Sequence, residues 1–203
     1  MFFLFKRHAS LKITLGLSLV LVPNAFTWGA PDRLGADTLP PQVPDAITSA
    51  NWQNHPKISA VRRIVESINA GLKSGAFKIS IRRFEYCEPY QDTLRKLAVD
   101  SKRVTRLYEK EAGSDDSSLT WRHYYDDAGR LRFVFISGGA VNGSRLEHRI
   151  YFDEGGKRIW EEHKYVKGPG YTFPEVWPDD ELQKSDARTA FSAKSTCREK
   201  KPR

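Results

Sequence analysis

Apolar residues recur at steps of three and four between positions 58 and 72, and polar residues fill the steps between them. The apolar set is Ile58, Val61, Ile64, Val65, Ile68 and Leu72. Side chains with this spacing lie on one side of a helix. Gly75 follows, and glycine accepts the left-handed conformation that commonly ends helices. The pattern therefore predicts one amphipathic helix that ends near Gly75.

Beyond Gly75 the pattern changes to the alternation of apolar and polar residues that is typical of strands. The first alternating segment starts at Phe77. Six more predicted strands follow: Leu94 to Val99, Val104 to Lys110, Leu119 to Tyr125, Leu131 to Ser137, Leu146 to Phe152 and Arg158 to Val166. One face of such a sheet needs a cover, and the helix is the available element. We expect an α+β fold in which the N-terminal helix packs on a six- to seven-stranded antiparallel meander sheet.

The alternation also assigns side chains to the two faces of the sheet. We expect the helix to cover the face that carries Trp121, Tyr125, Phe133, Phe135, Ile150 and Phe152. The opposite face would carry Arg122, Tyr124, Arg132, Glu147, Arg149 and Tyr151. Arg and Tyr offer large, directional contact areas in protein interfaces. The predicted binding surface is therefore Arg122, Tyr124, Arg149 and Tyr151, with plain cross-strand pairing on a solvated face as the alternative.

A repeat with a period of 27 residues runs through the predicted sheet. The sequence Asp-Asp-Ala-Gly-Arg-Leu at 126–131 aligns with Asp-Glu-Gly-Gly-Lys-Arg at 153–158. A fainter copy aligns Asp100 with Asp127 at the same step. Each copy places an acidic turn between two apolar runs, which is the chemistry of a β-hairpin. The sheet is therefore predicted to be built from 27-residue hairpin repeats.

The heptapeptide from Tyr125 to Leu131, Tyr-Asp-Asp-Ala-Gly-Arg-Leu, resembles the signature of YD-repeat hairpins, which are known from large exported shell-forming and surface proteins. The next copy departs from it, because Arg158 stands where leucine is expected. The resemblance covers about a third of the chain. It describes a hairpin, so it implies a scaffold or binding role. The arrangement also looks like small exported α+β proteins of bacteria, some of them inhibitor-like.

The N-terminus has the order of a signal peptide. Three basic residues lie within the first twelve positions, and the uncharged run 13–22 follows them. Ten residues at about 1.5 Å each are too short to cross a bilayer core of about 30 Å as a helix. We expect cleavage between Ala25 and Ala30, a periplasmic or extracellular location, and no transmembrane segment in the mature chain.

Composition divides the rest of the chain. Residues 1–30 form the predicted signal peptide, the proline-rich segment 31–54 a linker, residues 55–191 a single domain and residues 192–203 a basic tail, interpreted as a solvated end. The formal net charge is +8, to which residues 1–30 contribute +3 and residues 192–203 contribute +4. The nearly neutral body lacks the footprint that nucleic acids select, so nucleic acid is not an expected partner.

The chain has two cysteines, Cys87 and Cys197. Export would place both in a compartment where disulfides form and persist. A disulfide between them is the preferred interpretation, and two free or intermolecular thiols are the alternative.

Candidate chemistry is sparse, because neither a cofactor motif nor a catalytic arrangement stands out in the sequence. His123 and His148 are candidates for a metal site, although histidines packed in a sheet are favoured. The leading hypothesis is a non-catalytic periplasmic or secreted binding module, inhibitor-like or envelope-associated. It would bind an envelope or secreted protein through the Arg/Tyr surface or through the loops Glu111 to Ser118 and Gly138 to Ser144. A metal-dependent or hydrolytic envelope enzyme using His123 and His148, and a purely structural exported domain, are the alternatives.

Overall fold

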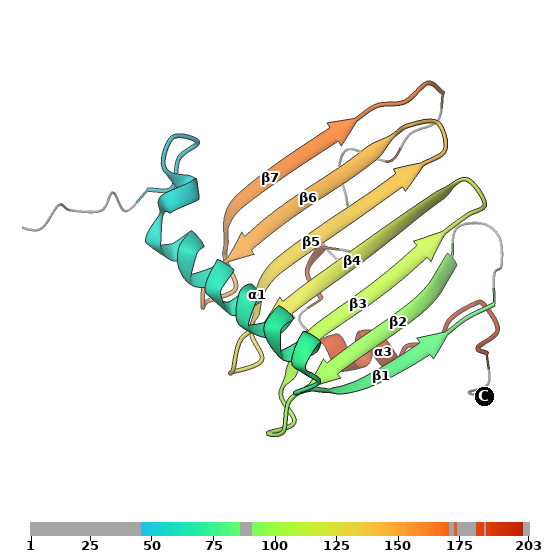
Figure 1. The fold of residues 1–203 in the computed structure, drawn as a ribbon, viewed down its shortest axis with the longest axis horizontal. Helices are drawn as coiled ribbons and strands as arrows, with labels where there is room; N and C mark the ends of the chain where they lie inside the picture. The colour runs from blue at the N-terminus through green and yellow to red at the C-terminus, as the bar shows by residue number, and fades with distance from the viewer. Residues whose placement is uncertain (1–45, 86–90, 171–172, 174–181, 185, 201–203) are drawn as a thin grey trace, which may run out of the picture. The chain divides into compact units, whose positions relative to one another are not determined.

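A computed structural model of the chain describes residues 46–85, 91–170, 173, 182–184 and 186–200. A 3-10 turn, η1 (Trp52–Asn54), precedes the long helix α1 (Pro56–Ser74), and a short helix α3 (Ala187–Ser192) follows the sheet. The strands are β1 (Lys78–Arg83), β2 (Gln91–Val99), β3 (Thr105–Gly113), β4 (Ser117–Tyr125), β5 (Leu131–Ala140), β6 (Arg145–Phe152) and β7 (Arg158–Val166). They form one open antiparallel sheet in the order of the chain (Figure 1). The predicted α+β fold with a seven-stranded meander is confirmed.

Both ends of α1 are fixed by local chemistry. The His55 Nδ1 atom accepts a hydrogen bond from the backbone N–H of Lys57 at 3.3 Å, and Pro56 occupies the first turn, where its missing N–H is not needed. Gly75 ends the helix with φ of 75°, and the N–H of Ala76 reaches back to the carbonyl of Gly71 at 2.9 Å.

The helix covers a single row of apolar side chains that crosses the sheet. Ile58, Val61 and Ile68 of α1 are fully buried against this row. The apolar row, read from β2 to β7 through cross-strand partners, is Ala98, Leu107, Tyr124, Phe133, Tyr151 and Trp160. Five strand spacings measure about 24 Å and a 19-residue helix about 28 Å, so α1 is long enough to span the row (Figure 1).

The predicted assignment of the faces is wrong. Tyr124 and Tyr151 lie under α1, whereas Trp121, Ile150 and Phe152 lie on the opposite face. The physical reason is an extra residue in the hairpin between β4 and β5. The register steps from Tyr124–Phe133 to Tyr125–Leu131 and skips Arg132, which shifts the alternation of β5 by one residue relative to β4.

The second face of the sheet is covered by the C-terminal part of the chain. Phe173 and Leu182 pack against Trp121, Ile150 and Phe152. The helix α3 lies behind the sheet in Figure 1, where its Ala187 packs on Leu97, Tyr108 and Tyr125. The hydroxyl of Tyr125 also donates to the carbonyl of Lys184 at 2.5 Å. The sheet therefore has an apolar core on each face.

Arginines hold the end of this C-terminal part. Arg95 donates to the carbonyl of Ala193 at 2.6 Å, and Arg82 donates to that of Phe191 at 2.7 Å, so two cations meet the carboxyl end of α3. Arg82 also forms an ion pair with Glu199 at 2.7 Å. Lys200 then donates its backbone N–H to the carbonyl of Arg83 at 2.8 Å. The interpretation of the basic tail as a solvated end is wrong for residues 199 and 200, which pair with β1 and Phe84.

Replacing Ile68 with alanine tests the seam between α1 and the apolar row. Ile68 is fully buried, so Ile68→Ala is expected to lower the free energy of unfolding by about 2 to 5 kcal/mol. The neighbouring Ser67 is exposed, and Ser67→Ala is expected to change it by less than about 0.5 kcal/mol. Urea denaturation followed by circular dichroism measures both. Equal effects of the two changes would contradict the packing of α1 described above.

Candidate functional site

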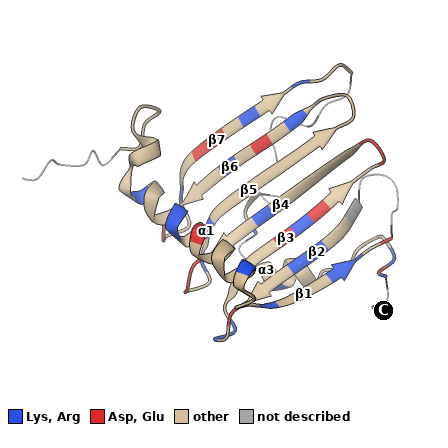
Figure 2. Cartoon of the chain, in the orientation of Figure 1, with Lys and Arg blue, Asp and Glu red and all other residues tan. Residues whose placement is uncertain are grey.

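Beyond the apolar row, the face that carries α1 becomes charged. Two positions further along each strand lies a second row, called here the charged row: Lys96, Glu109, Arg122, Phe135, Arg149 and Glu162, in order from β2 to β7. No helix in the described part of the chain covers this row, and Figure 2 shows both signs of charge on the strands beyond α1. Sheet faces of this kind are solvated or are covered by a partner.

Buried Glu109 organises one half of the charged row. Its carboxylate accepts a hydrogen bond from Arg122 Nε at 2.5 Å, and Lys96 Nζ lies 3.6 Å away. The side chain of Glu109 is 9% exposed and that of Arg122 is 35% exposed. Among the described residues, the two terminal nitrogens of Arg122 have no hydrogen-bond acceptor. Arg122 is therefore oriented by one nitrogen and retains two donors toward solvent.

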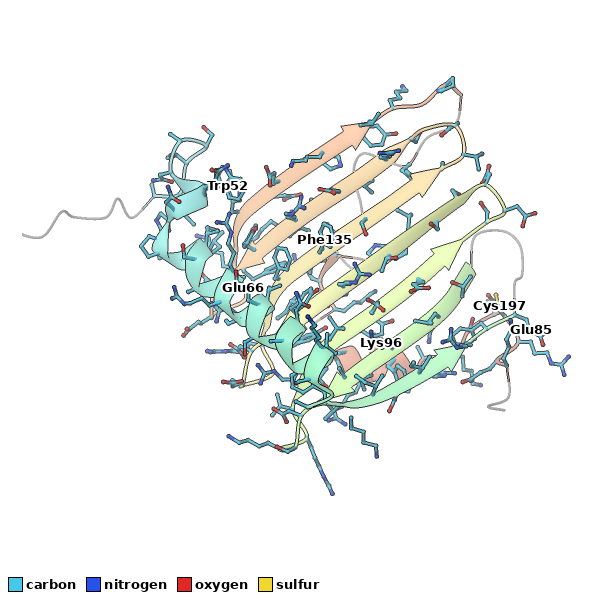
Figure 3. The ribbon with its side chains drawn as sticks, in the orientation of Figure 1. Trp52, Glu66, Glu85, Lys96, Phe135 and Cys197 are labelled. Atoms are coloured by element: carbon cyan, nitrogen blue, oxygen red, sulfur yellow. The ribbon has the colours of Figure 1, made fainter. Side chains whose placement is uncertain are left out.

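The other half of the charged row centres on Phe135 of β5. The guanidinium carbon of Arg149 lies 4.8 Å from the centroid of the Phe135 ring, which is a cation–π contact. Arg149 Nη1 also lies 2.9 Å from Glu147 Oε2. Figure 3 shows Phe135 and Lys96 on the face that carries α1. Phe135 therefore stands between two arginines, since Arg122 and Arg149 are its cross-strand partners.

The structure divides the four residues of the predicted binding surface. Arg122 and Arg149 lie in the charged row, but Tyr124 and Tyr151 are buried beneath α1. The Tyr124 hydroxyl donates to Asn69 Oδ1 at 3.4 Å, and burial raises the pKa of Tyr124 above its ordinary value. The two tyrosines support the helix, whereas Phe135, which sequence reasoning placed in the core, belongs to the open face.

The two predicted binding loops meet at the strand ends distant from α1. Val141 of the β5–β6 loop donates its N–H to the carbonyl of Asp116 in the β3–β4 loop at 2.8 Å. Hydrogen bonds from the hydroxyls of Ser114 and Ser117 lower the pKa of Asp116. Val141 is 82% exposed at the rim of an open hollow of about 610 Å³ between the loops. The open face thus extends from α1 to this pair of loops.

Three turns at the other end of the sheet share one geometry. They begin at Asp100, Asp126 and Asp153, whose Oδ1 atoms accept the backbone N–H four positions later at 2.8, 2.9 and 2.9 Å. The residue three positions after each aspartate has positive φ: 65° at Arg103, 76° at Gly129 and 81° at Gly156. The register of each hairpin skips the residue six positions after the aspartate, namely Arg106, Arg132 and Ile159.

This geometry changes the alignment of the faintest copy. The step is 27 residues from Asp126 to Asp153 but 26 residues from Asp100 to Asp126. The prediction that Asp100 corresponds to Asp127 is therefore wrong by one position. A constant period could not show this difference.

A charged groove of about 500 Å³ lies between α1 and these turns. Arg132 is buried there, 3.3 Å from Asp126 Oδ2 and 3.7 Å from Glu154 Oε1. Arg106 forms an ion pair with Asp127. Burial raises the pKa of Asp126, but hydrogen bonds from Arg130, Arg132 and Ala128 together hold it below its ordinary value. The arginines of the turns are thus already neutralised within the groove, which favours a structural role.

The two candidate metal ligands do not lie on adjacent strands. His123 of β4 stands opposite Val134 and His148 of β6 stands opposite Ile136, so β5 runs between them. His148 Nε2 lies 2.5 Å from Glu161 Oε1; burial lowers the pKa of His148, and the hydrogen bond to Glu161 acts in the opposite direction. Within the described residues, no group of three histidine, cysteine, aspartate or glutamate side chains is placed to hold a metal ion.

The predicted disulfide partners are described unequally. Cys197 is buried, and Cys87 lies outside the described residues. Figure 3 shows Cys197 near Glu85, whose backbone N–H donates to the carbonyl of Arg198 at 2.8 Å.

None of the helices in the described ranges is long and apolar enough to cross a membrane. Comparison of the chain with models of protein families, with curated proteins and with solved structures finds no match.

Replacing Asp126 with asparagine tests the neutralised groove. Asp126→Asn removes the acceptor charge from two arginines and is expected to lower the free energy of unfolding at pH 7 by about 2 kcal/mol. Since the pKa of Asp126 is lowered in the folded state, its stabilisation is present above the unfolded pKa of about 3.9 and is lost as the pH falls through the folded value. The difference between the two proteins should therefore shrink below about pH 4.

Asp153→Asn is the matched control, since Asp153 accepts the same two kinds of backbone hydrogen bond but, among the described residues, forms no ion pair with arginine. It should cost about 1 kcal/mol, with less dependence on pH. Urea denaturation from pH 3 to 7 measures both, and equal costs would contradict the role of the arginines.

Proposed function

We propose that this protein is an exported, non-catalytic binding module that recognises a protein partner through the charged row and the loops beside it. One observation carries the proposal: α1 covers only the apolar row, and no described element covers the charged row that follows it. The row contains two arginines on either side of an aromatic ring. Arginine and aromatic residues are enriched among those that dominate binding energy in protein interfaces.

The arginines of the charged row are held in place before a partner arrives. Arg122 is fixed by buried Glu109, and Arg149 is fixed by the Phe135 ring and by Glu147. Side chains ordered in advance lose less conformational entropy on binding. The strands beneath them are central in the sheet, so their backbones are paired on both sides. The surface is thus rigid, as a recognition surface should be.

The chemistry of the row indicates the partner. The terminal nitrogens of Arg122 can donate two hydrogen bonds to one carboxylate, while Phe135 offers apolar area beside it. Glu109 and Glu162 balance most of the positive charge of Lys96, Arg122 and Arg149. A folded protein that presents an acidic residue beside an apolar one fits this pattern better than a phosphate backbone does. An envelope or secreted protein is the class of partner that export would make available.

The two alternatives have less support. A metal-dependent or hydrolytic enzyme using His123 and His148 requires the two side chains to converge, and β5 runs between their strands. A purely structural exported domain requires no partner, which leaves the preorganised arginines of the charged row without a role.

Two further proposals concern the construction of the chain. We infer that the meander consists of hairpin repeats of about 27 residues, supported by the shared geometry of the turns at Asp100, Asp126 and Asp153. We also infer that Cys87 and Cys197 form a disulfide. Phe84 pairs with Glu199, which brings positions three residues before Cys87 and two residues after Cys197 side by side.

The double change Arg122→Ala/Arg149→Ala tests the binding surface. Partners captured from an envelope extract by the wild-type protein are identified, and the affinity of each for purified variants is then measured by calorimetry. Arginines at the centre of an interface commonly contribute about 2 kcal/mol each, so the double variant should bind at least tenfold more weakly.

The control is Arg63→Ala/Lys157→Ala, which removes the same charge from two exposed side chains outside the charged row. It should retain the wild-type affinity. Equal binding by both double variants would overturn the proposed surface. A bound metal ion in stoichiometric amount, or the absence of any partner, would instead favour the enzyme or the structural domain.

The mass of the exported protein tests the disulfide and the signal peptide together. Protein recovered from the periplasm or the medium should begin between residues 26 and 31 and should gain the mass of two hydrogens on reduction. Peptide mapping without reductant should join the peptides that contain Cys87 and Cys197. Cys197→Ser should abolish the change of mass on reduction, and two alkylatable thiols in the wild-type protein would contradict the pairing.

A further inference from the structure

The two edges of the sheet are treated differently. The outer edge of β1 pairs with the C-terminal segment, through Phe84 with Glu199 and through Lys200 with Arg83. The outer edge of β7 pairs with no residue in the described part of the chain. β7 has nine residues and contains no proline. A long, unpaired edge strand presents a row of backbone donors and acceptors that another strand can use.

The side chains on the α1 face of β7 make this edge complementary to itself. Trp160, Glu162, Lys164 and Val166 share the face, since their partners on β6 belong to the same rows as Tyr151 and Arg149. Val166 is 57% exposed. Among the described residues, neither Glu162 nor Lys164 forms an ion pair at 4.0 Å or less. The strand thus offers apolar, acidic, basic and apolar side chains in succession.

We propose that two copies of this chain associate through their β7 edges, antiparallel about a two-fold axis at His163, to form one continuous sheet. Two identical edges that pair antiparallel are related by an axis perpendicular to the sheet, so each face continues into the same face of the second copy. Residues that meet must therefore have numbers of equal parity. Only a few registers satisfy this condition, and charge distinguishes between them.

The register centred on His163 is the one that charge selects. It places Glu162 opposite Lys164 of the partner subunit and Trp160 opposite Val166 of the partner subunit, and each pair occurs twice. Centring the pairing on Glu162 instead would place Glu162 opposite Glu162 of the partner subunit, and like charges directly opposite each other are destabilising. The inference does not depend on the proposed function, because it rests on the edge of the sheet and not on its open face.

Charge reversal at positions 162 and 164 tests the register. Sedimentation equilibrium of the full mature chain should show a dimer for the wild type. Glu162→Lys places two pairs of lysines across the axis, and Lys164→Glu places two pairs of glutamates, so each should weaken dimerisation at least tenfold. The double variant Glu162→Lys/Lys164→Glu restores opposite charges and should recover the dimer. Glu66→Lys, an equal reversal of charge on the exposed side of α1, should have no effect.

Cysteine cross-linking tests the axis by a second route. His163→Cys should form a disulfide-linked dimer under mild oxidation, since position 163 meets itself and directly opposed Cα atoms lie about 4.5 to 5.5 Å apart. Glu161→Cys, which would meet Tyr165 of the partner subunit, should remain unlinked. Circular dichroism establishes that each variant is folded. A wild-type monomer at all concentrations, failure of the double variant to recover, or preferential linking at position 161 would overturn the proposal.

Discussion

The contact between α1 and the apolar row is the constraint from which the other surfaces of the molecule follow. A helix with its side chains is about 10 Å wide, whereas a nine-residue strand is about 30 Å long. One helix lying across the strands therefore covers about a third of their length. The chain changes from apolar to charged residues within two positions, as from Tyr124 to Arg122 and from Tyr151 to Arg149. The open charged face is the direct consequence of having one helix of this width.

The opposite face shows how the chain completes a cover when it needs one. There the strands carry apolar residues further along their length, and Phe173, Leu182 and α3 cover them. Arg82 and Arg95 then bind the carboxyl end of α3 and guide the chain to the edge of β1. The C-terminal part is therefore structural, and it covers one face and one edge while the charged row and the edge of β7 are left uncovered by the described residues.

Local features could be predicted from the sequence, and features that depend on a single inserted residue or on distant pairing could not. Alternation and turn chemistry gave β7 its bounds, Arg158–Val166, and Gly75 marked the end of α1. The skipped Arg132 reversed the assignment of the faces, so Tyr124 and Tyr151 were placed on the binding surface. The ion pair between Arg82 and Glu199 joins residues 117 positions apart, and no local pattern reports such a contact. The extra residue in each turn was the one available signal, because the skipped residue follows its aspartate by six positions.

The same insertion links the fold to its two kinds of arginine. At the skipped positions, Arg106 and Arg132 are directed into the charged groove beside α1, where Asp126 and Asp127 neutralise them. Arg122 keeps its place in the regular alternation, so it lies on the open face and retains donors toward solvent. Nearly equal charges in the sequence thus serve different purposes, and position relative to the skipped residue decides which. Net charge near zero in the body of the chain is compatible with a specific binding surface for this reason, since the neutralised arginines and the available ones are separated in space.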